Sequence, residues 1–421
     1  MNSSSRLNIE RVVTFEGARQ IVLDQARQVH GDMSGREEEV PLLESLGRTL
    51  AKDIHADRDF PPFPRATRDG YAVRSEDVSQ PPVELNLIGE VRAGGSLPEG
   101  FGELSSGQAI AIMTGAPVPA GSDAVVMVEH TERHGNSVCL LRSAQAGENV
   151  VVQGSEGVAG SVLISSGTLM GAAQIALAAA VGKARVRVQR RPVVAILSTG
   201  DEVVPISAMP ASNQIRNSNS FSLVAQVIAA GGEPRQLPIA PDEPNRLREL
   251  IAEGLESDLL LLSGGVSAGE YDLVEPALSE FSAEFFFTGV QMQPGKPLVF
   301  GRATAKSGRR TYFFGLPGNP ISTMVTFRLF ANIIVAALCG NRQETTRFLQ
   351  ARLAADLKTK TGLTRFLPAR LIGDLFQPEV ELVKWQGSGD MASFARADCL
   401  LVVPPDQEQF HAGETVSVFC I

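Results

Sequence analysis

The chain has 421 residues, 43% of them hydrophobic, which is enough for roughly three domains with buried cores and excludes a disordered protein. Lys and Arg number 38 against 47 Asp and Glu, giving a formal net charge of -9 with no separate basic block. Nucleic acid held by a general positive field is therefore not expected. Aromatic residues make up only 6%, with one Trp, so a platform for stacking single-stranded bases is not expected either. Any phosphate should be bound locally, by a loop.

The four cysteines are far apart and form no C-x-x-C pair, so neither a zinc knuckle nor a redox dithiol is predicted. The segment from Met1 to Arg11 is polar. The most apolar runs, Ala172 to Val181 and Phe330 to Leu338, are shorter than the ~18 residues that cross a membrane. We therefore expect a cytoplasmic protein with reduced thiols, no export signal and no membrane segment.

Helical spacing of apolar residues predicts a first helix after Thr14 and a second over Leu42 to Leu50. Three prolines between Phe60 and Pro64 end the helical pattern and mark a candidate boundary. Short strand-like runs separated by turn residues then predict a small β-rich insertion. Its expected strands are Val83 to Ile88, Ala109 to Met113, Ala124 to Val128 and Ser137 to Leu141.

From Pro192 onwards, short apolar strands alternate with helical stretches, which predicts a parallel sheet covered by helices. The expected strands are Val193 to Leu197, Arg235 to Ile239, Leu259 to Leu262, Glu284 to Phe287 and Tyr312 to Phe314, and the clearest helices are Ser220 to Ala230 and Arg246 to Leu255. After Gly340 the pattern changes to short strands with turn residues between them. These predict a terminal β-barrel or sandwich.

Three of the predicted strands run directly into glycine-rich loops, at Ser198 to Glu202, Ser263 to Gly269 and Gly315 to Pro320. Because the carboxyl ends of parallel strands share one edge of a sheet, we expect the loops to converge there. Glycines let backbone N–H groups approach an anion, and the helix that follows adds further donors. Each loop alone also fits an ordinary strand-to-helix turn. Together the three favour a phosphate cradle.

None of the loops is a Walker A motif, because Gly269 is followed by Glu270 rather than by Lys. They do not match the G-x-G-x-x-G dinucleotide fingerprint with its later acidic residue either. Lys296 lies between prolines on the stiffened loop Pro294 to Pro297 and suits a phosphate as a point charge. A solvated lysine in a turn is the alternative.

Acidic residues in or near the loops could together bind a hard cation such as Mg²⁺, which prefers oxygen ligands: Asp201, Glu202, Asp242, Glu270 and Asp272. Asp201 and Glu270 are equally explained as acidic residues near helix N-termini. His130 and His134 have the spacing of a helical metal pair, but the Gly135-Asn136 turn that follows predicts a hairpin instead. No G-x-S-x-G motif supports a Ser-His-Asp hydrolase.

Seven segments stand in order along nearly the whole chain: Leu46 to Ala51, Asp69 to Ala72, Met113 to Pro119, Ser198 to Glu202, Ser263 to Asp272, Pro294 to Pro297 and Gly315 to Ser322. In this order they resemble the molybdopterin molybdotransferase family, which comprises the bacterial MoeA proteins and the E domain of gephyrin. The resemblance implies an elongated homodimer of multidomain α/β plus β architecture. Its implied domains are a mixed dimerisation domain (1–59 and 152–189), a β-rich insertion (60–151), a molybdopterin-binding α/β domain with a parallel sheet (190–340) and a C-terminal β-barrel-like domain (341–421).

The same resemblance implies the final step of molybdenum cofactor biosynthesis, in which molybdate is inserted into adenylylated molybdopterin with Mg²⁺ and AMP is released. The implied partners are the molybdopterin adenylyltransferase that supplies the substrate and the molybdoenzymes or delivery proteins that take the product. The residues implied to bind the pterin phosphate and the adenylate are Ser263, Gly264, Gly265, Ser267, Gly269, Lys296, Pro317, Gly318, Asn319 and Ser388. The catalytic residues are implied to be Asp69, Thr114, Glu202, Asp242 and Asp272, with Asp69 and Thr114 facing the site from the other subunit, and the metal ligands are Glu156, Glu202, Asp242 and Asp272.

The chain departs from the family pattern at three positions that matter for charge. Val151 stands where family members usually carry Arg, and Gln293 stands where they often carry Lys. Asn217 stands in place of an Asp. Each missing cation could remove a charged hydrogen bond of about 1.5–3 kcal/mol. The family pattern also has an Asp, whose side chain is shorter, where this chain has Glu156.

These departures leave two hypotheses of different classes. One is the molybdotransferase, and the other is a noncatalytic paralogue that binds the cofactor or serves as a scaffold. The departures favour the scaffold, whereas the retained acidic residues and Lys296 favour the enzyme. An adenylyltransferase that makes the adenylate shares the S-G-G-x-S loop, but the extra β domains oppose it.

Overall fold

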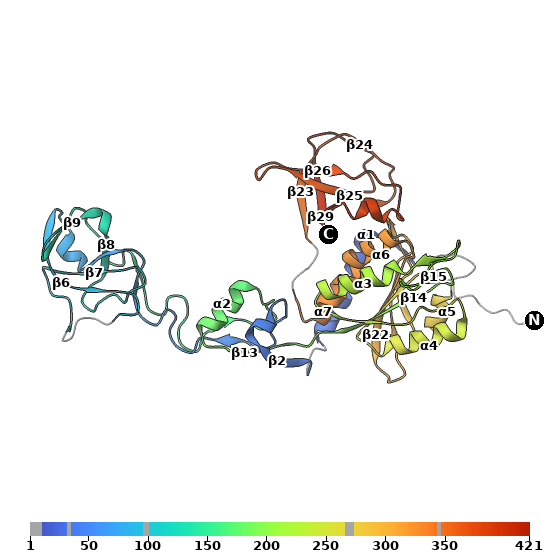
Figure 1. Ribbon diagram of the computed structural model, residues 1–421, viewed down its shortest axis with the longest axis horizontal. Coiled ribbons are helices and arrows are strands. Elements are labelled where there is room, and N and C mark those ends of the chain that lie inside the picture. Colours follow the sequence, from blue (N-terminus) through green and yellow to red (C-terminus); the bar gives the residue numbers. More distant parts are fainter. Residues whose placement is uncertain (1–10, 32–34, 96–100, 266–272, 343–346) are drawn as a thin grey trace, which may run out of the picture.

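The computed structural model describes residues 11–31, 35–95, 101–265, 273–342 and 347–421. The chain is drawn out along one axis, with a β-rich domain at one end, a small mixed domain in the middle, and an α/β domain and a barrel at the other end (Figure 1). Helix α1 (Phe15–Gly31) lies at the end with the α/β domain, where it packs against α7 (Asn332–Leu338). Strand β1 (Val12–Thr14), just before it, pairs with β20 (Gly289–Gln293).

The middle domain joins two separated stretches of sequence. Strand β2 (Glu37–Pro41) pairs with β13 (Arg185–Gln189), and β3 (Ile54–His55) pairs with β12 (Val162–Ile164) beside helix α2 (Ala172–Ala180). The predicted helix over Leu42 to Leu50 is wrong, because only the 3₁₀ turn η1 (Leu42–Ser45) forms there. Leu43 and Leu46 are 77% and 60% exposed, so the leucine spacing did not mark a buried helix face.

The β-rich domain confirms the four strands predicted for it. Its six-stranded sheet has the order β8-β5-β7-β6-β10-β9. The strands are β5 (Gly70–Val73), β6 (Val83–Val91), β7 (Gln108–Ile112), β8 (Ala124–Met127), β9 (Thr131–His134) and β10 (Ser137–Leu140), and β4 (Arg65–Ala66) pairs separately with β11 (Val150–Val151). His134 ends β9 at the hairpin turn, as predicted, and His130 lies in the 3₁₀ turn before it.

The α/β domain contains a six-stranded sheet of order β17-β14-β18-β22-β21-β19. Its strands are β14 (Val193–Ser198), β17 (Glu233–Gln236), β18 (Leu259–Ser263), β19 (Glu284–Phe287), β21 (Val299–Thr304) and β22 (Arg310–Leu316), with the small pair β15 (Val203–Val204) and β16 (Ile215–Arg216) outside it. The first four strands in the order are parallel, as expected, but β21 is antiparallel to both β22 and β19, so the sheet is mixed at that edge. The short link between β21 and β22 permits only a hairpin.

Helices cover both faces of this sheet, and two hydrophobic clusters lie between them and the strands. The helices are α3 (Ser218–Ala229), α4 (Pro244–Leu255), α5 (Val274–Ser279) and a long one made of α6 (Pro320–Thr326), the π-turn η4 (Phe327–Ala331) and α7. The long helix, Pro320–Leu338, has a mean hydropathy of 1.8 and could cross a membrane by length and composition, but 83% of it is buried inside the protein. That degree of burial is typical of a core helix.

The C-terminal strands close into a barrel, which confirms one of the two predicted alternatives. Closure follows because β25 pairs with both β26 and β27. The ring consists of β23 (Phe348–Leu353), β25 (Thr364–Gly373), β26 (Pro378–Leu382), β27 (Cys399–Val403) and β29 (Thr415–Cys420), with the pair β24 (Leu357–Lys358) and β28 (Gln409–Phe410) and the short helix α8 (Met391–Phe394) beside it. In the sheet order, β20 continues from β25, so the barrel is joined to the α/β domain.

Candidate functional site

The three glycine loops meet at the carboxyl edge of the sheet, as predicted. Strands β14, β18 and β22 are neighbours, with Ser198 opposite Ser263 and Ser263 opposite Leu316. The N–H of Thr199 donates to Ser263 O at 3.0 Å, and the N–H of Gly264 donates to Leu316 O at 3.3 Å. Backbone hydrogen bonds therefore hold the loops against one another.

Close packing between the first two loops requires glycine. Gly264 has a φ of +95°, and a Cβ there would lie 2.8 Å from Thr199 O. Gly265 also has a positive φ, of +65°, and a Cβ there would lie 3.0 Å from Thr199 Oγ1. A side chain at either position would strain the backbone or push the loops apart.

A small polar cavity of about 50 Å³, the glycine cavity, opens between the loops. Asn219, in the first turn of α3, spans it by donating through Nδ2 to Ser263 Oγ at 2.9 Å and to Gly318 O at 2.7 Å. Asn219 Oδ1 and Thr199 Oγ1 are buried and have no hydrogen-bond partner within the described ranges. Glu202 lines the same cavity. The glycine cavity thus combines unsatisfied oxygen atoms with a carboxylate.

Asp242 and Glu202 belong to two adjacent acidic loops. The N–H of Asp242 donates to Asp201 Oδ1 at 3.0 Å, and the N–H of Gly200 donates to Ala240 O at 3.1 Å. The carboxylate of Glu202 folds over Gly200, since a Cβ at Gly200 would lie 2.4 Å from Glu202 Oε2. Both predicted acidic residues therefore lie at the edge that carries the glycine cavity.

A second cavity, of about 360 Å³, lies between the α/β domain and the barrel and is called the Lys296 cavity. It is lined by the loop that carries Lys296, by Asn319 and by Ser388. The N–H of Ile321 donates to Ser388 O at 3.1 Å, which fixes the barrel loop at the start of α6. Lys296 is exposed and forms no ion pair within the described part of the chain. The cavity therefore presents a free cation next to the glycine loop of β22.

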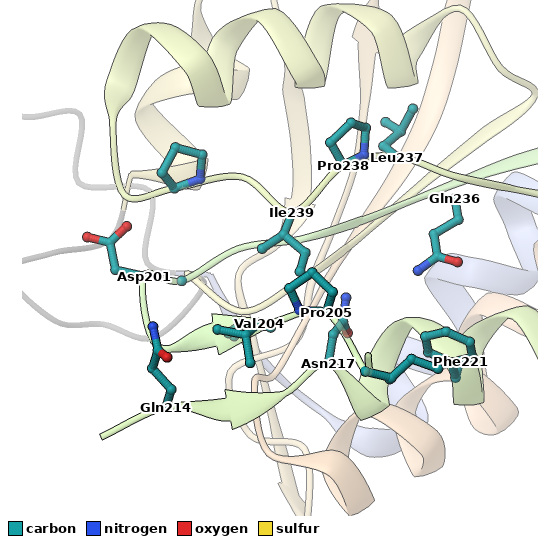
Figure 2. Close-up of a pocket in the computed structure, with 14 residues that line it drawn as sticks. Asp201, Val204, Pro205, Gln214, Asn217, Phe221, Gln236, Leu237, Pro238 and Ile239 are labelled. Carbon is teal, nitrogen blue, oxygen red and sulfur yellow. The ribbon is translucent and has the colours of Figure 1, made fainter. Parts of the chain in front are cut away.

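The third cavity, of about 650 Å³, is called the apolar cavity and lies on the other side of the glycine cavity. Figure 2 shows Val204, Pro205 and Ile239 along it, with Asp201 at one end and Phe221 at the other. It shares Val203 and Asn217 with the glycine cavity. Strand β17 ends at Gln236, earlier than predicted, which leaves the following residues to line this cavity.

The remaining predicted residues lie far from this edge in the same chain. Asp69 and Thr114 belong to the β-rich domain, at the opposite end of the molecule (Figure 1). Asp69 Oδ1 accepts from both the N–H and the hydroxyl of Thr114 at 2.7 Å. The hydrogen bond from the Thr114 N–H, followed by the bond from its hydroxyl, lowers the pKa of Asp69 below its ordinary value. Glu156 forms an ion pair with Arg65 at 3.0 Å.

The predicted metal ligands do not form one cluster in a single chain. Glu156 pairs with Arg65 of β4, whereas Glu202 and Asp242 lie on the α/β domain. The described residues contain no group of three or more His, Cys, Asp or Glu suited to a metal. Ser267, Gly269 and Asp272 lie outside the described residues. The oxygen atoms of Glu202, Asn219 and Thr199 nonetheless match the ligand preference of Mg²⁺, because two of them are buried acceptors without a partner.

Three departures from the family pattern have structural counterparts. Asn217 is 4% exposed and caps α3, with Oδ1 accepting from the N–H of Ser220 at 3.0 Å. Val151 and Gln293 each face an arginine as their cross-strand partner. Arg65 stands opposite Val151, and Arg365 stands opposite Gln293 and donates to its Oε1.

Sequence reasoning did not identify Thr199, Asn219 or Arg365. Thr199 lies inside the glycine loop Ser198 to Glu202, and its place in that loop is the signal that could have identified it. Asn219 and Arg365 belong to none of the seven segments, and only the packing of α3 and of the barrel places Asn219 in the glycine cavity and Arg365 opposite Gln293.

Three segments of the chain match known family descriptions. Residues 13–182 match the MoeA N-terminal region (domain I and II), residues 195–337 match the probable molybdopterin binding domain, and residues 350–420 match the MoeA C-terminal region (domain IV).

Individual relatives agree over most of the chain. A protein named molybdopterin molybdenumtransferase from Bacillus subtilis is 35% identical, covering 95% of this chain and 94% of its own. One of the same name from Nostoc sp. is 39% identical over 72% of this chain and 69% of its own length. A crystal structure of the molybdopterin biosynthesis moeA protein from Pyrococcus horikoshii OT3 has 28% identity and a TM-score of 0.77, covering 98% of this chain and 100% of that chain. The chain therefore belongs to the MoeA family of molybdopterin molybdenumtransferases.

Proposed function

We propose that this protein inserts molybdate into adenylylated molybdopterin with the help of Mg²⁺ and releases AMP, as the final step of molybdenum cofactor formation. The observation that carries the proposal is the glycine cavity, where glycine loops, unsatisfied oxygen atoms and the carboxylate of Glu202 meet beside the cation of Lys296. An anhydride with two phosphates needs such a combination of donors, a cation and metal ligands. The relatives' names support the same substrate class.

Each part of the edge has a role in this proposal. Backbone N–H groups of the glycine loops other than that of Gly264, which donates to Leu316 O, would hold phosphate oxygens, and Lys296 would neutralise part of their charge. Glu202, Asn219 and Thr199 are the residues that would hold Mg²⁺. When bound, this ion would polarise the phosphoanhydride as a Lewis acid. Asp242, held close by the Asp201 loop, would orient the ion's water ligands.

The working form in this proposal is a homodimer. Asp69 and Thr114 form a hydrogen-bonded pair in the β-rich domain, at the opposite end of the chain from the loop edge (Figure 1). A two-fold dimer would bring this face of one subunit to the loop edge of the other. We further propose that the enzyme works in the cytoplasm, between an adenylyltransferase that supplies the substrate and molybdoenzymes or delivery proteins that accept the product.

The noncatalytic alternative rests on the missing charges, and the structure weakens that basis. Arginines at 65 and 365 stand next to the neutral residues Val151 and Gln293, so each location keeps a cation. Asn217 serves as a helix cap, a role that Asp and Asn fill about equally well. These neighbouring residues support the enzyme over the scaffold.

The test supplies adenylylated molybdopterin, molybdate and Mg²⁺ to the purified protein and measures AMP release and cofactor formation together. Both products should appear in equal amounts, and both should stop when Mg²⁺ is chelated. Omitting molybdate is the control for simple hydrolysis. Absence of turnover at high enzyme concentration would support the scaffold instead.

A further inference from the structure

Two of the four cysteines lie opposite each other at one end of the barrel. Cys399, the first residue of β27, and Cys420, the last residue of β29, are partners in the register of these antiparallel strands. One step further along, the N–H of Ile421 donates to Asp398 O at 3.2 Å, so that next pair is hydrogen-bonded. Because the two kinds of pair alternate, Cys399 and Cys420 form the non-hydrogen-bonded kind, with Cα atoms about 4.5 Å apart. This separation lies within the range of about 4.4–6.8 Å that a disulfide spans.

The two thiols also share one face of the strands. Cys399 belongs to the barrel core, whereas Leu400 and Phe419 belong to the core shared with the α/β domain. Residues directly opposite each other on antiparallel strands point to the same face, so Cys420 lies on the barrel side with Cys399. Burial, then the Asp398 carboxylate and then Cys420 raise the pKa of the Cys399 thiol to about 12, which agrees with two sulfur atoms close together.

The two cysteines differ in their access to solvent. Cys399 is buried, whereas Cys420 is half-buried. Within the described ranges, the pairing of β29 with β23 ends at Phe419, so Cys420 is paired only with β27. A reagent in solution therefore reaches Cys420 first, and Cys399 lies beside it as a resolving thiol.

This end of β29 also contacts the α/β domain. Arg328, on η4 of the long core helix, donates through Nη2 to Cys420 O at 3.3 Å, and its guanidinium lies 5.8 Å from the centre of the Phe419 ring. The helix begins at Pro320, directly after the glycine loop of β22. A covalent bond at Cys420 would therefore also restrain a contact between the barrel and the helix that follows the loop edge.

We propose that Cys399 and Cys420 are a reversible disulfide site, which joins the end of β29 to β27 when a small-molecule disulfide oxidises the pair. Neither cysteine lines the three cavities of the loop edge, so the assignment is independent of the proposed function. The absence of a C-x-x-C motif concealed the pair, because strand register rather than sequence spacing creates it.

The reaction is two successive thiol–disulfide exchanges. The Cys420 sulfur attacks one sulfur of the small disulfide, which forms a mixed disulfide and releases the first small thiol. Cys399 then loses its proton and attacks the Cys420 sulfur, which closes the protein disulfide and releases the second small thiol. The two protein thiols are oxidised, the small disulfide is reduced, and the two protons leave on the released thiols. The high pKa of Cys399 makes the second exchange slow at neutral pH and faster as the pH rises.

The experiment incubates the purified full-length protein with oxidised glutathione at mildly alkaline pH, alkylates the remaining thiols and determines the masses of tryptic peptides without reduction. Residues 397–421 contain no Lys or Arg, so one peptide carries both cysteines. This peptide should lack two hydrogen atoms and carry no alkyl group, and it should accept two alkyl groups after treatment with a dithiol reductant. The oxidised protein should melt at least about 3 °C higher than the reduced protein, because the crosslink restricts the unfolded barrel.

Three variants separate the two steps. Cys399→Ser should stop at the mixed disulfide on Cys420 and show no rise in melting temperature. Cys420→Ser should leave Cys399 without glutathione, because Cys399 is buried. Cys139→Ser is the matched control and should not change the crosslink, since Cys139 is also a half-buried strand residue but has Glu84 and Glu132 opposite it.

Four results would overturn the assignment. Two alkyl groups on the wild-type peptide after oxidation, or a mixed disulfide that persists there, would show that the pair does not close. A crosslink between the peptides of two chains would assign Cys420 to a contact between copies. An unchanged or lower melting temperature of the crosslinked protein would show that the bond does not stabilise the end of β29.

Discussion

The loop edge of the α/β domain and the Asp69 face of the β-rich domain both carry carboxylates and hydroxyls, but they are constructed differently. At the loop edge, three strands hold the loops by backbone hydrogen bonds, and Asn219 Oδ1 and Thr199 Oγ1 remain unsatisfied. At the other face, Asp69 is exposed and already accepts both hydrogen bonds that Thr114 can offer. The first region contains a cavity within one chain, whereas under the proposed function the second would be completed by the other subunit.

Because of this difference, mutations in the two regions should have different effects on stability and activity. Substitutions at the loop edge should change stability and binding together, because the same backbone contacts serve both. Substitutions at the Asp69 face should spare the fold and affect only a step that requires two chains. The following predictions test that separation.

The largest effect is expected from removing charge at either region. Glu202→Gln and Asp69→Asn should each lower turnover roughly a hundredfold, because each removes a charged group next to the reacting anhydride. If the site spans two subunits, dimers formed from an equal mixture of the two variants should regain about a quarter of the wild-type activity, since half of the dimers then contain one intact site. The measurement is AMP release by co-expressed, jointly purified variants. Activity no higher than that of either variant alone would place both residues in one chain's site.

Asp258, directly before β18, tests whether the sheet can be destabilised at the ends of β18 and β14 opposite the glycine loops without a loss of turnover. Its carboxylate is 2% exposed, pairs with Arg36 at 2.9 Å and with Arg309, and accepts from the N–H of Val193 at 2.7 Å. Asp258→Asn should cost about 1.5–3 kcal/mol of unfolding free energy, because Arg36 and Arg309, which are partly exposed, lose a charged hydrogen-bond acceptor. Urea denaturation measures this loss. Turnover per folded molecule should not change, and a parallel loss of turnover would show that these strand ends belong to the catalytic unit.

The same residue predicts a pH dependence of stability. Burial raises the pKa of Asp258, but Arg309, the Val193 N–H and Arg36 outweigh it, so the pKa in the folded protein is below its ordinary value. A lowered pKa stabilises the fold above the unfolded-state pKa of about 3.9, and this contribution is lost as pH falls through the lower folded pKa. Wild-type stability should therefore fall more steeply than that of Asp258→Asn below about pH 4. Thermal melting against pH measures both slopes.

Glycine substitutions test the close packing of the loops. Gly264→Ala should lower the unfolding free energy by about 1–3 kcal/mol, because the new Cβ meets Thr199 O and the φ is positive. Gly318→Ala is the control for stability, since its Cβ would lie 3.6 Å from Gly264 Cα, an ordinary contact. Thermal unfolding of both variants gives the comparison. Equal stability of the two would mean that the loops can separate without cost.

The smallest effect is expected at Thr114. Thr114→Val removes the hydroxyl bond to Asp69 but keeps the backbone N–H bond, which is the larger cause of the lowered pKa. The pKa of Asp69 should rise only in part, and the acid limb of the pH profile of turnover should move slightly towards higher pH. The profile is measured by AMP release. An unchanged fold with an unchanged profile would show that Asp69 does not act through its ionised form.

Secondary structure was predicted best where burial and periodicity agree. The strands over Val193–Ser198 and Leu259–Ser263 are continuous apolar runs, and the structure buries every residue of the second. The helix expected over Leu42 to Leu50 did not form, and Leu43 and Leu46 are largely exposed although Leu50 is buried, so the leucine spacing did not mark one buried face. The antiparallel edge at β21 and β19 was also missed, because a local sequence pattern does not specify strand direction.

The sequence by itself determined the family, the order of domains and the glycine loops, because these depend on local residue types in fixed succession. Only the tertiary structure decided that Asn219 spans the glycine cavity, that Arg365 stands beside Gln293, and that an apolar cavity adjoins the acidic loops. These contacts join residues far apart in sequence, and the register between strands and the packing of helices create them. The same packing places Asp69 and Thr114 at the far end of the chain from the loop edge, a separation that sequence spacing does not reveal (Figure 1).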